Sequence, residues 1–274
     1  MPAAYTPQQK SAIQEFSGIT QADKATAAKL LKSHDWNVGA AVNAYYSGNS
    51  ASNPARAPLN KIFDSYRENA AEEPDEIGID GTMKMLGQLQ IEPDDVAALV
   101  FSEIVASPSL GKLTREGFVD GWSELFIDTL PKMRNFILQR RSELSTNADV
   151  FKNVYTHTFQ LALQPGSKTL PIDMAVEFWR TLFAPPGFDW RTPNSPWLDW
   201  WLEFQSATRT KAVNKDLWKQ TLAFARETVR DDTLSFWSDE SSWPSVVDEF
   251  VGWVREEKHA GGAPGQDAMA VDER

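Results

Sequence analysis

With 274 residues, 42% of them hydrophobic, the chain is long enough for one or two domains with hydrophobic cores. It contains no cysteine, which excludes disulfides, thiolate nucleophiles and thiolate zinc sites, and we expect an intracellular location in the cytoplasm or nucleus. A formal net charge of -11 makes the average surface repel phosphate backbones, so the expected partners are basic protein surfaces and not nucleic acid.

The N-terminal segment, residues 1–5, has neither the basic nor the apolar region of a signal peptide. Nowhere do about eighteen apolar residues run together, which is the length that a membrane-spanning helix needs. We therefore expect that the chain is not secreted and that it does not bind a membrane.

Residues 6–48 are expected to form a small domain of three short helices. Thr6, followed by proline, is a typical N-cap, and Asn37 can cap the third helix. Thr20 and Asp23 resemble a capping box that starts the second helix. Apolar residues recur beside these caps at helical spacing: Leu30, Leu31, Trp36, Ala41, Val42, Ala44 and Tyr45.

Composition changes twice along the chain. Residues 49–58 are small, polar and proline-containing, so they bury too little apolar surface to be ordered and are expected to be a linker. Residues 258–274 lose all hydrophobic periodicity and are expected to be a disordered tail. A second domain of residues 59–257 lies between them.

Two aromatic stripes indicate that the second domain is helical. Ser195 and Pro196 look like a cap and first helical residue, and Ser242 looks like the cap of a second helix with Pro244 in its first turn. Apolar residues follow each start at helical spacing: Trp197, Trp200, Trp201 and Phe204, then Trp243, Val246, Val247, Phe250, Val251 and Val254. Hairpin signals are scarce, so the expected fold class is all-α.

The segment around Gly78 resembles the EF-hand calcium loop only in part. With Gly78 as the central glycine, Glu73 and Asp75 occupy the first and third ligand positions. The fifth and twelfth positions are Ile77 and Lys84, so an apolar group and a cation replace two oxygen ligands. We expect no calcium or other metal here, and interpret the segment as a degenerate EF-hand-like helix-turn-helix in which Ile79 pairs two loops.

The sequence carries no recognisable catalytic signature. There is no G-x-S-x-G elbow, and the sequence that starts at Gly111 lacks the upstream glycine and the hydroxyl of a phosphate-binding loop. The histidines, His34, His157 and His259, lie in different segments. Pairs of carboxylates that could perform acid–base chemistry are not excluded, but they are too common in sequences to count as evidence of catalysis. We expect a non-enzymatic protein without a cofactor.

The small domain resembles the ubiquitin-associated (UBA-like) family. Residues 27–31, 34–38 and 41–46 match its second and third helices. The loop expected at residues 17–20 reads Ser-Gly-Ile-Thr, where ubiquitin binders usually carry a Met-Gly-Phe type sequence. Binding of ubiquitin or of a ubiquitin-like modifier by this domain therefore stays open.

Seven segments of the second domain, in order and after a UBA-like domain, resemble the defective-in-cullin-neddylation family. They are residues 77–81, 118–122, 151–159, 164–166, 178–179, 214–218 and 242–251, and the likeness runs from about residue 6 to residue 256. The resemblance implies a scaffold-type co-E3 that binds the C-terminal winged-helix subdomain of a cullin, the acetylated N-terminus of the neddylation E2 and a cullin-associated RING protein. The thioester stays on the E2, in agreement with the absence of cysteine, and the scaffold acts by proximity and orientation.

In that family an Asp, Ala, Asp patch holds the cullin, and the matching residues here are Asp216, Ser242 and Asp248. Asp216 has a simpler interpretation as a carboxylate at a helix N-terminus, and Asp248 as part of a solvated face. The groove that holds the E2 peptide is mostly apolar at the matching positions: Ile79, Met85, Leu89, Ala98, Leu99, Phe101, Leu113, Leu161 and Phe178. Four further groove positions are more polar: Thr82, Asp94, Ser102 and Thr181.

Core packing is the alternative role of Leu89, Leu99 and Leu161. The alternative function for the whole chain is a ubiquitin-binding adaptor, in which the UBA-like domain binds and the helical domain is structural.

Overall fold

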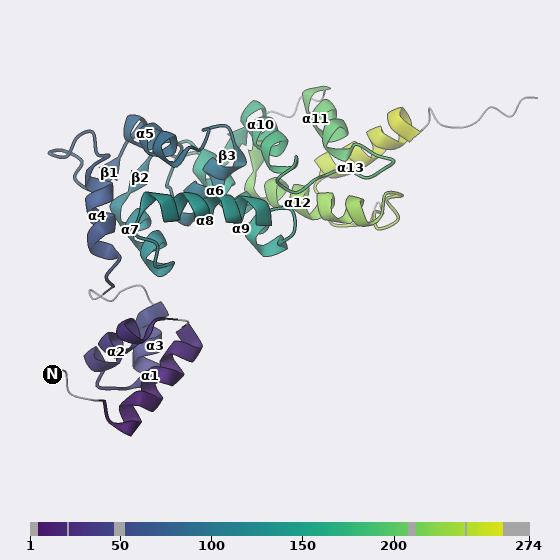
Figure 1. The fold of residues 1–274 in the computed structure, drawn as a ribbon. Coiled ribbons are helices and arrows are strands. Elements are labelled where there is room, and N and C mark those ends of the chain that lie inside the picture. Colours follow the sequence, from purple (N-terminus) through teal and green to yellow (C-terminus); the bar gives the residue numbers. More distant parts are fainter. Residues whose placement is uncertain (1–4, 21, 47–52, 208–211, 239, 260–274) are drawn as a thin grey trace, which may run out of the picture. The chain divides into compact units, whose positions relative to one another are not determined.

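A computed structural model describes residues 5–20, 22–46, 53–207, 212–238 and 240–259 (Figure 1). The chain divides into two compact units, residues 1–141 and residues 142–274, and the division falls inside the expected domain of residues 59–257. Helices dominate the described part of both units, and the strands found there form two-stranded sheets. The predicted all-α fold class is confirmed.

The first unit begins with helices α1 (Pro7–Thr20), α2 (Lys24–Ser33) and α3 (Val38–Tyr46). They enclose a small core in which Phe16, Ala27, Leu31 and Ala41 have no exposed surface. Trp36 and Tyr45 pack against the edge of this core. The predicted three-helix core is confirmed, because apolar residues at helical spacing face one another across the three helices.

Two of the three predicted caps of these helices are confirmed. Thr6 Oγ1 accepts from the backbone N–H of Gln9 at 3.3 Å, and Asn37 Oδ1 accepts from that of Ala40 at 2.9 Å. The capping box at Thr20 was wrong. Thr20 ends α1 and donates its hydroxyl to the Phe16 carbonyl at 2.8 Å.

Asp23 is the N-cap of α2 instead. Its Oδ1 accepts from the backbone N–H groups of Ala25 at 2.8 Å and Thr26 at 3.1 Å. Asp23 serves better than Thr20 because a carboxylate also interacts favourably with the partial positive charge of the helix N-terminus. Residues 17–20, expected as a loop, are the last turn of α1.

Helix α4 (Arg56–Asp64) begins inside the expected linker. Residues 56–58 are therefore helical, and residues 49–52 of the linker lie outside the described residues. Asn53 Nδ2 donates to the Ser123 carbonyl at 2.8 Å and Arg56 Nη1 to Asp120 at 2.6 Å, which fixes this segment against α7 (Arg115–Glu124). Leu59 and Phe63 are fully buried, so tertiary packing outweighs the polar composition of the segment.

Two helix–strand–helix segments follow the three-helix core in the first unit. The first runs through α4, β1 (Glu76–Ile77) and α5 (Ile79–Leu89), and the second through α6 (Val96–Ile104), β2 (Leu113–Thr114) and α7. The strands pair antiparallel with Ile77 opposite Leu113. The predicted pairing residue, Ile79, was wrong: Ile77 is buried in the pair, whereas Ile79 opens α5 and is 66% exposed. Helix α8 (Leu130–Glu143) is the last to begin in this unit.

The second unit contains α9 (Ala148–Ala162), β3 (Thr169–Pro171), α10 (Ile172–Leu182), α11 (Trp197–Ala207), β4 (Ala212–Asn214), α12 (Lys215–Arg230), α13 (Ser245–Trp253) and the π-helix η1 (Val254–His259). Strands β3 and β4 pair antiparallel, with Thr169 opposite Asn214. Residues 258–259, expected in the tail, are thus helical, and residues 260–274 lie outside the described residues.

The core of the second unit is aromatic. Trp179 and Trp218 stack with their ring centroids 5.5 Å apart, and Tyr155 stacks on Trp218 with the centroids 4.6 Å apart. The buried Tyr155 hydroxyl donates to the Trp218 carbonyl at 2.7 Å and accepts from Trp179 Nε1 at 3.1 Å. Burial raises the pKa of Tyr155 well above its ordinary value, so the phenol is neutral in the folded protein.

Both predicted aromatic stripes face this core. Trp197, Trp201 and Phe204 are buried on α11, and Trp200 is half-buried. On α13 and its continuation the buried residues are Val247, Phe250, Val251 and Val254. The starts of the two helices differ from the prediction.

Helix α11 begins one residue later than predicted, since the Pro196 carbonyl accepts the backbone N–H of Trp200 at 3.1 Å. Helix α13 begins at Ser245 after Pro244, and the Pro244 carbonyl accepts from the backbone N–H of Val247 at 2.8 Å. Ser242 precedes this turn, so the predicted cap at Ser242 was wrong.

Candidate functional site

Asp216 is the second residue of α12 and its side chain is exposed. The helix starts here because Asn214 ends β4 and caps α12, its Oδ1 accepting from the backbone N–H of Leu217 at 2.8 Å. The next residues, Leu217 and Trp218, are buried and anchor the first turn in the aromatic core. A rigid helix start therefore presents the Asp216 carboxylate to solvent.

Asp248 lies in the first turn of α13 and is half-buried. Its Oδ1 accepts a hydrogen bond from Trp237 Nε1 at 2.9 Å. Val247 and Phe250, on either side of it in the sequence, point into the core, so Asp248 lies on the outer face of the helix. Sequence patterns missed Trp237, because it lies in the non-helical segment between α12 and α13, where no periodicity marks it.

Ser242 is exposed and precedes α13. Helices α12 and α13 pack through Phe224 and Phe250, whose rings are 5.9 Å apart, and Trp243 packs on Phe224 at 5.7 Å. The three predicted cullin-binding residues thus lie in one unit, on two helix starts and the turn that precedes one of them. No hydrogen bond or ion pair joins them to one another within the described part of the chain.

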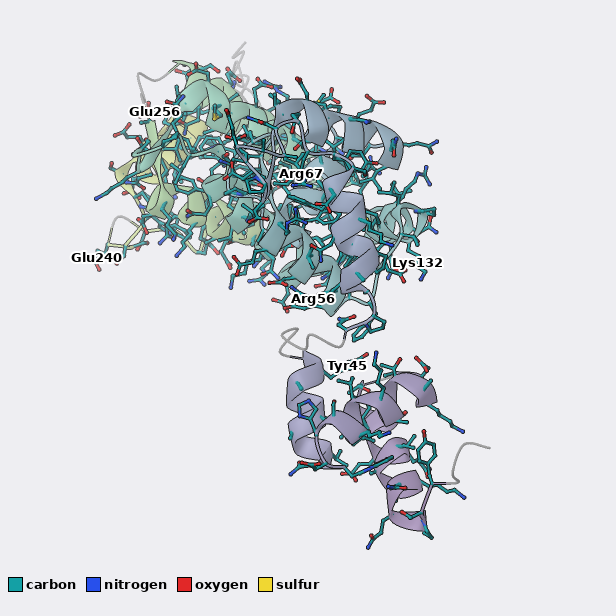
Figure 2. All side chains as sticks on the ribbon, turned by 90° about the vertical axis from the view of Figure 1, so that its left-hand side faces the viewer. Tyr45, Arg56, Arg67, Lys132, Glu240 and Glu256 are labelled. Atoms are coloured by element: carbon teal, nitrogen blue, oxygen red, sulfur yellow. The ribbon has the colours of Figure 1, made fainter. Side chains whose placement is uncertain are left out.

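The charge around these residues is mixed but mainly acidic near α13. Glu249, Glu256 and Glu257 are exposed there, and Glu240 lies in the preceding segment; Figure 2 labels Glu240 and Glu256 on the surface of this unit. Lys215 and Lys219 flank Asp216. Asp216 and Asp248 form no ion pair with any cation that the structure describes, so both carboxylates are available to a basic partner.

Most predicted groove residues of the first unit are buried: Met85, Leu89, Ala98, Leu99, Phe101 and Leu113. Ile79 differs, since 66% of it is exposed, and Met83 and Leu110 are also exposed. A Cβ on Gly111 would lie 2.9 Å from Ile79 Cγ1, so the side chain rests on that loop. Ile79 therefore exposes apolar surface beside the loop that contains Gly111.

Most polar residues at the groove positions form hydrogen bonds within the chain. Thr82 is buried and donates its hydroxyl to the Gly111 carbonyl at 3.2 Å, while Ser102 donates to the Ala98 carbonyl at 2.8 Å. Asp94 is exposed. The remaining groove residues, the buried Leu161, the half-buried Phe178 and Thr181, belong to the second unit.

The EF-hand-like segment holds an arginine among its oxygen atoms. The Arg115 guanidinium donates to Asp64 Oδ1 at 2.7 Å, Asp75 Oδ1 at 2.6 Å and Asn60 Oδ1 at 3.0 Å. Glu68 accepts from the backbone N–H groups of Gly78 and Gly81; burial acts to raise its pKa, but these bonds outweigh burial and lower it. In the part of the chain that is described, no three acidic or histidine side chains form a metal-binding group.

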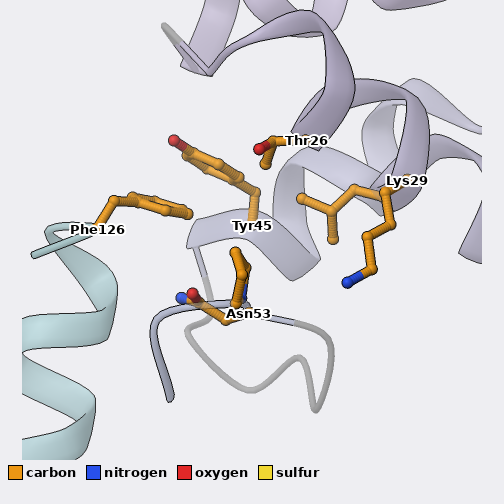
Figure 3. A pocket seen from close by; sticks show the side chains of 7 residues that line it. Thr26, Lys29, Tyr45, Asn53 and Phe126 are labelled. Carbon is orange, nitrogen blue, oxygen red and sulfur yellow. The ribbon is translucent and has the colours of Figure 1, made fainter. Parts of the chain in front are cut away.

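The UBA-like helices carry an exposed apolar residue, Ile19, which is 50% exposed on the last turn of α1. A pocket lined by Thr26, Lys29 and Tyr45, among others, is shown in Figure 3. Its volume of about 30 Å³ is the room of a single water molecule. This pocket is too small to serve as a ligand site.

No helix in the described ranges is both long and apolar enough to cross a membrane. Two family models match the chain: a UBA-like domain over residues 10–52 and a cullin-binding domain over residues 132–253. The second match contains Asp216, Ser242 and Asp248.

Curated relatives match over nearly the whole chain. Defective in cullin neddylation protein 1 of Pyricularia oryzae is 32% identical, with 91% of this chain and 94% of the relative covered. The protein of the same name in Cryptococcus neoformans is 33% identical, with 90% and 94% covered, and that of Yarrowia lipolytica is 31% identical, with 89% and 96% covered. The chain belongs to the defective in cullin neddylation protein 1 family.

Proposed function

We propose that this chain is a non-catalytic scaffold, a co-E3 that promotes transfer of a ubiquitin-like modifier to a cullin. The observation that carries the proposal is the cullin-binding match over residues 132–253, because it contains all three predicted contact residues. The geometry supports it: Asp216 and Asp248 are presented from anchored helix starts and are free of cations among the described residues. The acceptor is the C-terminal winged-helix subdomain of the cullin, which offers the basic surface.

The second contact of the scaffold is the acetylated N-terminus of the neddylation E2. The exposed Ile79 supplies apolar surface for it, whereas Met85 and Leu113 are buried beneath the surface and would contact the peptide only after side chains rearrange. Acetylation removes the charge of the terminal amine and with it the cost of desolvation on an apolar surface. Apolar burial contributes about 25 cal/mol per Å², so burial of one large apolar side chain of the peptide against this surface supplies about 1.5–3 kcal/mol.

The scaffold accelerates transfer by orientation. Two partners held on one chain meet at a higher effective concentration than in solution, and the reacting groups are held in a productive geometry. The chain has no cysteine, so the modifier stays as a thioester on the E2 until the cullin lysine attacks it. The cullin-associated RING protein completes the assembly.

A reconstituted transfer assay tests the proposal. The chain is added to E1, E2, modifier, ATP and a cullin bound to its RING protein, and modified cullin is followed with time. We expect faster transfer and no thioester or other adduct on this chain. An unchanged transfer rate, or an adduct on this chain that a thiol removes, would contradict the scaffold function.

A ubiquitin-binding adaptor is the second candidate, supported by the exposed Ile19 at the end of α1. Titration of the chain with ubiquitin, followed by NMR of the α1–α3 amides, distinguishes the two functions. Shifts around Ile19 together with no effect on cullin transfer would favour the adaptor.

A further inference from the structure

The indole of Trp237 lies between two side chains of opposite charge. Its Nε1 donates to Asp248 Oδ1 at 2.9 Å, and its ring faces the Arg255 guanidinium, whose Cζ lies 4.6 Å from the ring centroid. The N–H edge of the Trp237 indole thus binds the Asp248 carboxylate, while the face of the ring contacts the Arg255 guanidinium.

The residues that precede Trp237 are anchored at three points. The Asp231 carboxylate accepts from the backbone N–H groups of Thr233 at 3.0 Å and Ser235 at 2.8 Å. Leu234 is 1% exposed, and Phe236 packs on the buried Phe224 with ring centroids 5.8 Å apart. The indole is therefore presented from a fixed backbone, as a group that orients another side chain requires.

The hydrogen bond leaves one Asp248 oxygen for a partner. Oδ1 is engaged by the indole, and Oδ2 has no hydrogen bond in the described portion of the chain. Without the indole, the half-buried carboxylate could change rotamer and the Arg255 guanidinium would lose its aromatic face. Arg255 and Asp248 contact the same indole, so without it no aromatic face holds the guanidinium away from the carboxylate.

We propose that Trp237 is a positioning residue for cullin binding: it orients Asp248 and keeps Arg255 on its own ring, so that Oδ2 meets a cation of the cullin. This inference rests on the proposed function, in which Asp248 contacts the cullin. Trp237 itself acts through Asp248.

The substitution Trp237→Phe tests this role, because it removes the N–H donor and keeps an aromatic face. We expect the Kd for the cullin C-terminal domain to rise about tenfold, which corresponds to about 1.4 kcal/mol. The thermal melt should change little, since the Asp248 carboxylate can be hydrated instead. Trp253→Phe is the matched control: Lys258 Nζ lies 4.6 Å from the Trp253 ring centroid, but no described carboxylate accepts from this indole. Its Kd should stay within about twofold of the wild type.

A double-mutant cycle separates positioning from a general structural effect. In an Asp248→Ala background, Trp237→Phe should cause no further loss of cullin affinity, because the residue through which it acts is gone. The NMR resonance of the Trp237 indole N–H should also move on Asp248→Ala. Equal losses in both backgrounds, with an unmoved indole resonance, would overturn the positioning role.

The outcomes distinguish this inference from the function on which it rests. If Asp248→Lys abolishes cullin binding and Trp237→Phe leaves it unchanged, the positioning role is wrong and the scaffold function stands. If Asp248→Lys leaves cullin binding unchanged, the proposed contact is wrong, and the role of Trp237 in it is wrong as well.

Discussion

Reversal of both aspartates, Asp216→Lys with Asp248→Lys, is the most direct test of the proposed cullin-binding surface. The two residues differ in environment, since Asp216 is exposed and Asp248 is half-buried with one oxygen bonded to Trp237. A charge at the rim of an interface mainly changes the association rate and its salt dependence, whereas loss of one member of a desolvated pair costs about 2–5 kcal/mol. That range corresponds to about a 30-fold to a 4,000-fold loss of affinity.

We expect Asp248→Lys to raise the Kd by at least about 30-fold, near the lower end of that range, because Asp248 is not fully buried. Asp216→Lys should mainly slow association, with an effect that shrinks as salt is raised, since the Debye length is about 10 Å at 0.1 M ionic strength. The double reversal should therefore abolish measurable binding and transfer to the cullin.

The effect of these substitutions on folding stability is smaller than the expected effect on cullin affinity, so the two can be separated. A lysine at position 216 loses about 0.3–1 kcal/mol of helix-dipole stabilisation without touching any partner. Asp173→Lys is the matched control, because Asp173 is also an exposed aspartate at the second position of a helix, α10. It should cost similar stability and leave cullin affinity unchanged.

The assay combines three measurements. Isothermal titration calorimetry at two salt concentrations gives the affinity for the cullin C-terminal domain, thermal melting gives the stability, and a titration gives the affinity for the acetylated E2 peptide. Cullin binding that survives the double reversal with an unchanged melt would refute the reasoning and place the interface elsewhere. An equal loss in Asp173→Lys would refute it too, because it would show that the effect is not local.

The remaining predictions concern the groove, a cap and the aromatic core. The acetylated E2 peptide should bind more tightly than its free-amine form in a fluorescence titration; equal affinities would contradict an apolar acceptor surface at Ile79. Asp23→Ala should lower the stability of α1–α3, measured by hydrogen exchange, because two backbone N–H groups lose their acceptor. Asp23→Asn should restore most of that stability. Tyr155→Phe should cost about 1–3 kcal/mol in urea unfolding, because the Trp218 carbonyl and Trp179 indole lose their partner. Since the folded pKa of Tyr155 is raised, its contribution should be present below about pH 10 and lost above it, and Tyr155→Phe should flatten that loss.

Local sequence determined much of the secondary structure. The all-α class, the caps at Thr6 and Asn37, and the inward stripes of α11 and α13 depend on residues within a few positions of one another, where helical spacing decides which side chains share a face. The three-helix core of residues 6–48 follows for the same reason. The resemblance to the family also rested on segments that are short and ordered along the chain.

Tertiary structure decided what depends on distant partners. Strands β1 and β2 have two residues each and lie 36 positions apart, so no local pattern separates Ile77, which pairs and is buried, from the exposed Ile79. Helix α4 begins in a polar segment because Leu59 and Phe63 are buried by packing that the segment itself does not encode. The hydrogen bond from Trp237 to Asp248 joins a non-helical segment to a helix start, and only the folded backbone, which anchors Phe236 on Phe224, brings that donor to its acceptor.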